Sequence, residues 1–328
     1  MKIPPRWVLL FAAAVAALAP RLAHAQSYPV RPIIVIVPFA PGGGTDVAAR
    51  IVGDHMSRTL GQQLVVQNIA GAGGTVGSAR AMRAEPDGYT ILMGQMGTHA
   101  AAVALYPSLP YRPDVDFEPI GMVAAAPVVI AAKKDFPPNN LEEFAAYVKA
   151  NADKINVGHA GVGSTFFTTC LMLDSILGVK PTLVPFNGGA PAMNALVAGQ
   201  VDYLCADVLT SAPQLQAGTI KGYAIASADR SPMLPQVPTT AEAGLAEFQA
   251  STWFAFFAPK ATPGPILDKL TDALDRALDD EGVRKRLAEV GNDIPDKAAR
   301  GREALRALLK REIARWTPII RAAGVKAE

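Results

Sequence analysis

The sequence has few of the residues that hold metal ions or form disulfides. Its 328 residues include two cysteines, Cys170 and Cys205, and four histidines. It contains no HExxH stretch and no paired CxxC, so zinc sites lack their usual ligands. The cysteines could form one disulfide, but free cysteine is often a small buried hydrophobe, and a chain of this size needs no covalent staple. We expect two unpaired buried cysteines and no metal ion.

The sequence also lacks an excess of charge. It has 31 Lys and Arg and 29 Asp and Glu. Lys2, Arg6 and Arg21 lie in the first 25 residues, so the rest of the chain carries 28 basic and 29 acidic side chains. Proteins that bind nucleic acids carry an excess of basic side chains that cluster on one surface. Nucleic acid is therefore not an expected partner.

The one long apolar run lies near the N-terminus. Lys2 and Arg6 precede an apolar run over 7–18, and Ala23-His24-Ala25 follows it. This order is typical of a secretory signal peptide, and the run is shorter than the roughly 20 residues that a spanning helix needs. We expect residues 1–25 to be a cleaved signal peptide and the remaining chain to be exported and soluble.

Motifs of nucleotide binding and of hydrolysis are missing. No GxxxxGK[ST] stretch occurs, and GAGGTVG (71–77) has the wrong spacing for a dinucleotide turn. Ser164, His159 and Asp207 supply the residue types of a hydrolase triad, but there is no G-x-S-x-G elbow and no S-x-x-K. We expect no cofactor. A secreted serine hydrolase using Ser164 and His159 remains the alternative function.

What the sequence does contain is a repeated alternation of β-branched runs, glycine-rich turns and helical stretches. The predicted strands are 33–39, 64–68, 90–94, 155–158, 182–186, 201–206 and 222–227. The predicted helices include 45–60, 141–150, 164–177, 264–278, 281–290 and 301–323. Strands that alternate with helices predict parallel sheets covered on both faces.

Two stretches interrupt this alternation. The proline-rich stretch 106–119 is followed by a long extended segment, 120–133, broken only at Pro127, and "TWFAFF" (252–257) reads as a strand that returns to the first sheet. We therefore predict an α/β protein with two lobes, each a mainly parallel sheet flanked by helices. Lobe 1 comprises 26–127 and 253–328, and lobe 2 comprises 128–252. The crossings between them predict a hinge that lets the lobes close on a ligand.

The glycine-rich turns indicate an anion. Strand-to-helix turns occur at 42–44, 71–74, 94–98, 161–164 and 187–189. Ligands of open α/β sheets bind beyond the carboxyl ends of the strands, where backbone N–H groups and helix N-termini favour negative charge. Without a phosphate-binding lysine, a carboxylate fits these amides better than a nucleotide does. Asp46 has two compatible roles here, as a helix cap and as part of the ligand shell.

Four segments in this order resemble the Bug-type solute-binding receptors of tripartite tricarboxylate transporters. They are YPVRPIIVIVPFAPGGGTDVAARIV (28–52), NIAGAGGTVGS (68–78), PDGYTILMG (86–94) and PQVPTTAEAG (235–244). The resemblance implies a two-lobed periplasmic protein, expected to be a monomer, that closes on a small carboxylate and delivers it to a membrane permease. A partner that presents its ligand to a sensor would have the same fold.

The resemblance also implies which residues bind the ligand. In lobe 1 they are Phe39, Ala40, Gly43, Thr45, Asp46, Thr98 and His99. In lobe 2 they are Gly163, Ser164, Thr165, Asn187, Gly188 and Asp207. The expected hydrogen-bond donors are Ser164, Thr165, Thr98 and the amides of 42–44.

The chain departs from the family pattern at two places. Asn187 stands where such proteins commonly have Lys or Arg, and Phe166 and Phe167 stand where a His often follows the Gly-Ser turn. The missing basic side chain weakens the case for a highly charged tricarboxylate as the ligand. It favours a less charged or aromatic carboxylate as the ligand. The two phenylalanines either face the ligand or, as the favoured interpretation, belong to the core of helix 164–177.

Overall fold

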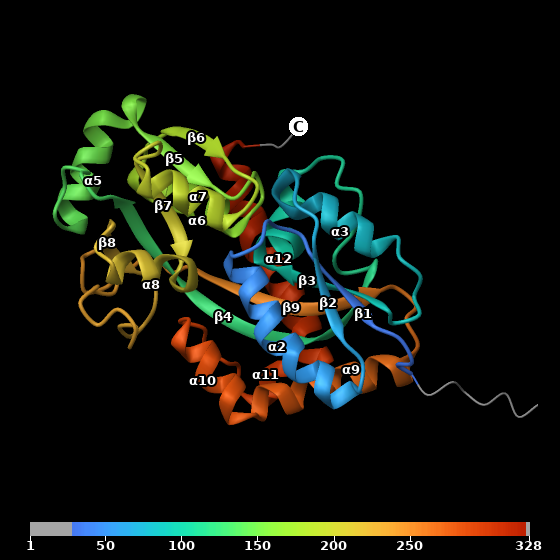
Figure 1. Cartoon of the computed structure of the whole chain (residues 1–328). Coiled ribbons are helices and arrows are strands. Elements are labelled where there is room, and N and C mark those ends of the chain that lie inside the picture. Colours follow the sequence, from blue (N-terminus) through green and yellow to red (C-terminus); the bar gives the residue numbers. More distant parts are fainter. Residues whose placement is uncertain (1–27, 326–328) are drawn as a thin grey trace, which may run out of the picture.

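The structure, a computed structural model, describes residues 28–325 (Figure 1). The predicted signal peptide lies outside the described residues. The strands are β1 (Ile33–Val37), β2 (Leu64–Asn68), β3 (Thr90–Gln95), β4 (Phe117–Lys133), β5 (Asn156–His159), β6 (Thr182–Pro185), β7 (Tyr203–Asp207), β8 (Ile220–Ile225) and β9 (Ser251–Pro259). The longer helices are α2 (Gly44–Leu60), α3 (Thr75–Met82), α5 (Leu141–Asn151), α6 (Thr165–Leu177), α7 (Gly189–Val197), α8 (Val208–Gln216), α9 (Gly264–Asp279), α10 (Glu281–Glu289) and α12 (Arg302–Ala323). The short helical segments are η1 (Ala72–Gly74), η2 (Gly97–Ala101), α4 (Ala102–Leu105), η3 (Ala152–Lys154) and α11 (Lys297–Arg300). Within this part of the chain, no helix has the length and apolar character that crossing a membrane requires.

The sheet has two halves that meet in β4. Its order is β2-β1-β3-β9-β4-β7-β5-β6, with β8 also paired to β4. The first half contains β1, β2, β3 and β9, and the second half contains β5, β6, β7 and β8. Strand β1 is parallel to β2 and β3, and β5 is parallel to β6 and β7. The crossing strands β4 and β9 run antiparallel to their neighbours, as Figure 1 shows between the two halves.

Strand β4 changes partners at one point. Residues 117–127 pair with β9, whereas residues 128–133 pair with β7 and β8. Pro127, which cannot donate a backbone hydrogen bond, is the last residue paired with β9. The predicted extended segment is therefore one continuous strand that belongs to both halves.

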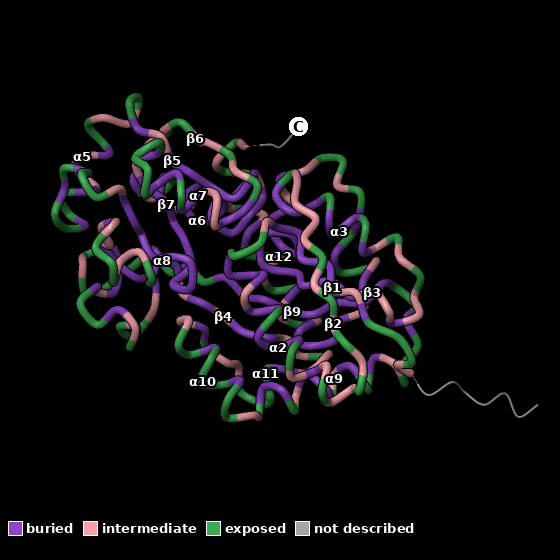
Figure 2. Tube along the Cα trace, in the orientation of Figure 1, coloured by how far each residue is buried: buried purple, intermediate pink, exposed green. Residues whose placement is uncertain are grey.

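Strand β9 explains how the first half is packed. Phe254 and Phe256 point to the face covered by α2 and α9, while Trp253 and Phe257 point to the face covered by α12. Successive side chains of a strand alternate between faces, so an uninterrupted apolar run fits a strand buried on both sides. Figure 2 shows β9 as buried along most of its length.

Helices also cover both faces of the second half. Helices α5 and α6 pack on one face, and α7 and α8 on the other. Helix α8 starts directly after β7, capped by the Asp207 side chain, which accepts a hydrogen bond from the Thr210 N–H at 2.8 Å. The sequence did not indicate this helix, because Pro213 lies within it.

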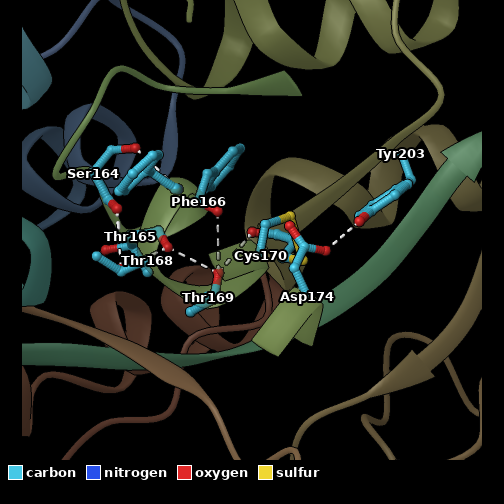
Figure 3. The surroundings of a disulfide bond; sticks show 10 residues. Ser164, Thr165, Phe166, Thr168, Thr169, Cys170, Asp174 and Tyr203 are labelled. Carbon is cyan, nitrogen blue, oxygen red and sulfur yellow. Dashed lines mark hydrogen bonds between the residues drawn. A yellow bond between two sulfur atoms is a disulfide. The ribbon is translucent and has the colours of Figure 1, made fainter. Parts of the chain in front are cut away.

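The expectation of two unpaired cysteines is wrong. Cys170 on α6 and Cys205 on β7 form a disulfide, with their α-carbons 5.1 Å apart and a sequence separation of 35 (Figure 3). Helix α6 lies directly on β7, and the Thr169 hydroxyl donates to the Cys205 carbonyl at 3.2 Å. This packing brings together two side chains whose proximity the sequence does not reveal.

Candidate functional site

A chamber of about 380 Å³ lies where the turns of the two halves face each other. The first half contributes Phe39, Gly71, Ala72, Gly73, Gly74 and Tyr106, and the second contributes Ala160, Gly161, Val162, Pro185, Phe186 and Asn187. Two larger surface hollows, of about 590 and 620 Å³, are lined by the first half alone, and a third, of about 510 Å³, lies between α6 and the C-terminal end of α12. The chamber is the candidate site because glycine-rich turns at the carboxyl ends of strands from both halves line it.

A second, inner cavity adjoins the chamber. Its volume is about 20 Å³, which is room for little more than a water molecule. Phe39 and Ala160 line both spaces. The other residues around the inner cavity are Gly43, Gly44, Thr45, Gln95, Ser164, Thr165, Phe166, Gly189, Asp207 and Phe254. The two spaces together form one site with a wide outer part and a narrow inner part.

Unused backbone donors come from both halves. The N–H groups of Ala72, Gly73 and Val162, which line the chamber, donate no hydrogen bond within residues 28–325. Gly73 has a φ of +61°, and the Val162 carbonyl lies so close to its α-carbon that a side chain would overlap it. Glycine is required here both for the left-handed backbone and for the close approach of the two halves.

Lys and Arg are absent from the described residues that line either space. The helices α2, α3, α6 and α7 begin at the surrounding turns, so several helix N-termini supply partial positive charge instead. Backbone N–H groups and helix ends of this kind bind an anion without a cationic side chain. The one ionisable residue in the lining of the inner cavity is an acid, Asp207.

Polar contacts join the two halves around the site. The Tyr106 hydroxyl contacts the carbonyls of Ala72 and Val162, which lie on opposite sides, and burial raises the pKa of Tyr106 to about 12. The Ala40 N–H donates to the Asn187 carbonyl at 3.1 Å. The structure therefore has the halves in direct contact.

A buried cluster of three side chains links the halves at the inner cavity. The Thr165 hydroxyl on α6 donates to the Gln95 side-chain oxygen on β3. Thr252 on β9 lies 3.0 Å from the Thr165 hydroxyl. All three residues are buried.

Asp46 stabilises the glycine-rich turn at 42–44. Its carboxylate accepts hydrogen bonds from the Gly42 N–H at 3.0 Å, from Arg50 at 3.0 Å and from Asn68 at 2.9 Å. Burial opposes its charge, but these donors lower its pKa. Because its acceptors are occupied by its own half, Asp46 positions the turn and does not line the site.

Thr98 and His99 lie behind the cavity. The Thr98 hydroxyl contacts the Gln95 N–H at 3.1 Å and His99 Nδ1 at 2.8 Å. The His99 ring stacks on Phe257 at 4.1 Å, and burial lowers its pKa to about 3. A neutral histidine in this position packs behind the end of β3 and does not line the cavity.

The three residues of the alternative hydrolase triad are not connected. Ser164 Oγ accepts from the Phe167 N–H at 3.2 Å, as the cap of α6. Asp207 caps α8, and His159 Nδ1 has no hydrogen-bond partner in the described residues. Burial lowers the pKa of His159 to about 4. A nucleophile needs a base within hydrogen-bond reach, and residues 28–325 contain no such pair among these three.

Phe166 and Phe167 have different surroundings. Phe166 lines the inner cavity and also packs in the second-half core, whereas Phe167 packs against His159 and the apolar core beneath α12. Both are almost fully buried. Of the two, only Phe166 lines either space.

The structure thus sorts the predicted site residues into three groups. Phe39, Gly43, Thr45, Ser164, Thr165, Asn187 and Asp207 line the chamber or the inner cavity. Ala40, Gly163 and Gly188 lie where the halves touch. Asp46, Thr98 and His99 stand behind the lining. Their roles in binding remain predictions.

Sequence reasoning missed part of the lining. The residues not predicted are Gly71, Ala72, Gly73, Gly74, Gln95, Tyr106, Ala160, Gly161, Val162, Pro185, Phe186, Gly189 and Phe254. The turn at 71–74 was recognised as a strand-to-helix turn but not included in the ligand shell. Gln95 lies in the predicted strand-to-helix turn at 94–98 but was not included in the ligand shell, and Tyr106 carried no motif that could have identified it.

The arrangement is that of a two-lobed periplasmic binding protein. The periplasmic binding protein BugD is 41% identical with a TM-score of 0.88, covering 92% of this chain and 100% of BugD. MatC from Rhodopseudomonas palustris with bound malate is 47% identical, with a TM-score of 0.87 over 89% of this chain and 100% of MatC. Rpa4515 from R. palustris with adipate is 29% identical, with a TM-score of 0.86 over 91% and 99%. Residues 48–325 match the tripartite tricarboxylate transporter family receptor model, and the chain belongs to this receptor family.

Proposed function

We propose that this protein is a periplasmic receptor that binds a small organic carboxylate between its two halves and delivers it to the permease of a tripartite tricarboxylate-type transporter. The observation that carries the proposal is the lining of the chamber. It combines free backbone N–H groups from both halves with neutral side chains. A volume of about 380 Å³ lies within the range of small-molecule sites.

The relatives support a carboxylate as the ligand class. MatC was solved with malate and Rpa4515 with adipate, both small dicarboxylic acids. A carboxylate matches the surplus of donors at the turns, and its removal from water on closure strengthens each of those hydrogen bonds. An aromatic carboxylate fits as well, because Phe39, Tyr106 and Phe186 form part of the wall.

Ligand entry requires movement of the halves. The inner cavity holds no more than a water molecule, and the Tyr106 and Ala40 contacts join the two halves. We propose lobes of 26–127 with 253–328 and of 128–252, with a hinge in the crossing strands β4 and β9. The change of partners of β4 at Pro127 supports this division.

The location and the delivery step rest on the leader and on the family. Cleavage after residue 25 would release a monomeric receptor into the periplasm. N-terminal sequencing of the protein from a periplasmic fraction tests this, with Gln26 as the expected first residue. Detection only in the cytoplasm with an intact leader would contradict it.

Filling the mouth of the chamber tests the binding site. Asn187 is exposed and lines the chamber, so Asn187→Trp should block it at little cost in stability. Asn139→Trp, at an exposed position outside the chamber, is the matched control. Calorimetric titration with malate, succinate, adipate, citrate and benzoate should give saturable binding of at least one acid, reduced at least tenfold by Asn187→Trp alone. Binding of none, or equal binding by both variants, would contradict the proposal.

A further inference from the structure

The inner cavity has several donors and a single carboxylate acceptor. Neither the Thr45 hydroxyl nor the Gln95 side-chain amide donates a hydrogen bond within residues 28–325. The Ser164 hydroxyl accepts from the Phe167 N–H, so its own hydrogen is free to donate. The acceptor is Asp207, which lies opposite the first turn of α2. This combination is more specific than a simple anion site.

The Asp207 carboxylate is held in one orientation. Its Oδ1 accepts from the Thr210 N–H at 2.8 Å. Its Oδ2 points at Gly44, where a methyl carbon on that residue would lie 2.9 Å away, and it accepts no hydrogen bond from the described residues. Asp207 is only 4% exposed. Asp207 thus lines the inner cavity as a buried carboxylate whose Oδ2 accepts no hydrogen bond from the described residues.

A buried carboxylate with an unpaired oxygen is costly, and a second carboxylate beside it adds repulsion. Burial raises the pKa of Asp207, and hydrogen bonds from Thr210 oppose this shift. A ligand that places a donor against Oδ2 removes the cost, whereas a ligand with only acceptors does not.

We propose that Asp207 selects a carboxylate ligand that also carries a hydroxyl or ammonium donor. This inference rests on the proposed function and adds the chemistry of the ligand. Hydrogen bonds to charged groups are among the strongest, and a site built around one discriminates against analogues that lack the partner. We expect the donor-bearing acid to bind at least tenfold more tightly than its counterpart without the donor.

Malate, aspartate and succinate provide the test, because they share a four-carbon dicarboxylate and differ in one hydroxyl or ammonium group. Calorimetric titration should rank malate or aspartate at least tenfold above succinate, and the better of the two identifies the donor. In Asp207→Asn the side chain can still accept the hydrogen bond from the Thr210 N–H and cap α8, but a donor replaces the free acceptor. The ratio of the affinity for malate or aspartate to the affinity for succinate should therefore fall close to one. Asp280→Asn, the same change at the cap of α10, should leave the ratio unchanged.

The outcomes distinguish a failure of this inference from a failure of the proposed receptor function. Equal binding of all three acids, preference for succinate, or an unchanged ratio in Asp207→Asn would overturn the role of Asp207 and leave the receptor function standing. If a different acid is the ligand, the same comparison is made between its hydroxylated and unhydroxylated forms. Failure of every carboxylic acid to bind would overturn both.

Discussion

Gly97 and Gly163 touch across the two halves of the molecule. The Gly163 carbonyl lies against the Gly97 α-carbon so closely that an added methyl group would overlap it. Gly97 does not have the left-handed backbone that favours glycine. Its lack of a side chain therefore serves the contact between the halves and not the local fold of η2.

Gly97→Ala should weaken ligand binding roughly tenfold or more while keeping the protein folded. The methyl group opposes closure by overpacking, which typically costs about 1–3 kcal/mol. Calorimetric titration and thermal unfolding measure the two effects. Gly53→Ala in α2 is the control, because its methyl would meet Leu64 at an ordinary 3.6 Å. Equal affinity of Gly97→Ala and wild type would contradict closure through this contact.

Ser164→Ala should lose both stability and affinity. The side chain caps α6, and removal of a cap costs about 0.5–2 kcal/mol. The sequence alone predicted only that its hydroxyl donates to the ligand. Asn140→Ala removes the equivalent cap of α5, far from the chamber, and should lose stability alone. Denaturant unfolding and ligand titration of the pair separate the two roles. Unchanged affinity in Ser164→Ala would remove its hydroxyl from the ligand shell.

The Cys170–Cys205 disulfide should stabilise the second half. The disulfide closes a loop of 35 residues, and its restriction of the unfolded chain should raise the free energy of unfolding by about 3–4 kcal/mol. The double variant Cys170→Ala with Cys205→Ala should unfold at correspondingly lower denaturant. Thiol titration of the unfolded wild type should find no free thiol before reduction and two after it. Two free thiols before reduction would show that the pair is not formed.

Asp174 should make stability depend on pH. Its carboxylate accepts from the Tyr203 hydroxyl (Figure 3), and burial raises its pKa to about 7, with that hydrogen bond opposing the shift. The folded state then binds a proton that the unfolded state releases near pH 4. The stabilisation is therefore complete below pH 4 and is lost as the pH rises to about 7.

Comparison of wild type with Asp174→Asn isolates this effect. Asn can still accept from Tyr203 but does not titrate. Between pH 4 and pH 7, wild type should lose on the order of 1–4 kcal/mol relative to the variant. Burial lowers the pKa of His99 and His159, so these two side chains make stability rise with pH. Their contribution is the same in wild type and in Asp174→Asn and cancels in the comparison. Parallel stability profiles of the two proteins would contradict the shifted pKa.

Much of the fold follows from local sequence patterns. The strand over 64–68 and the glycine turns lie where the sequence predicts them, because β-branched runs and glycine clusters act locally. The extended segment predicted over 120–133 starts three residues earlier, at Phe117. The continuity of β4 through Pro127 was not evident, since it depends on the exchange of one partner strand for another.

The parts of the site that escaped prediction depend on contacts between distant segments. Tyr106 lies in a proline-rich stretch without periodicity, yet its hydroxyl reaches Val162 on the other half. Asp46 was expected to reach the ligand, but Asn68, from the neighbouring strand, occupies one of its oxygens. Such partners are fixed by tertiary packing, which no local pattern encodes.

The central claim is that the chamber between the halves binds an organic carboxylate. A thermal-shift screen of the purified protein against organic acids tests it most directly, with sugars and neutral amides as controls. A ligand at 100 times its dissociation constant adds about 2.7 kcal/mol, which raises the Tm by a few degrees at this size. We predict a concentration-dependent rise with at least one carboxylic acid and none with the controls. No rise with any acid, or an equal rise with a neutral control, would contradict the account.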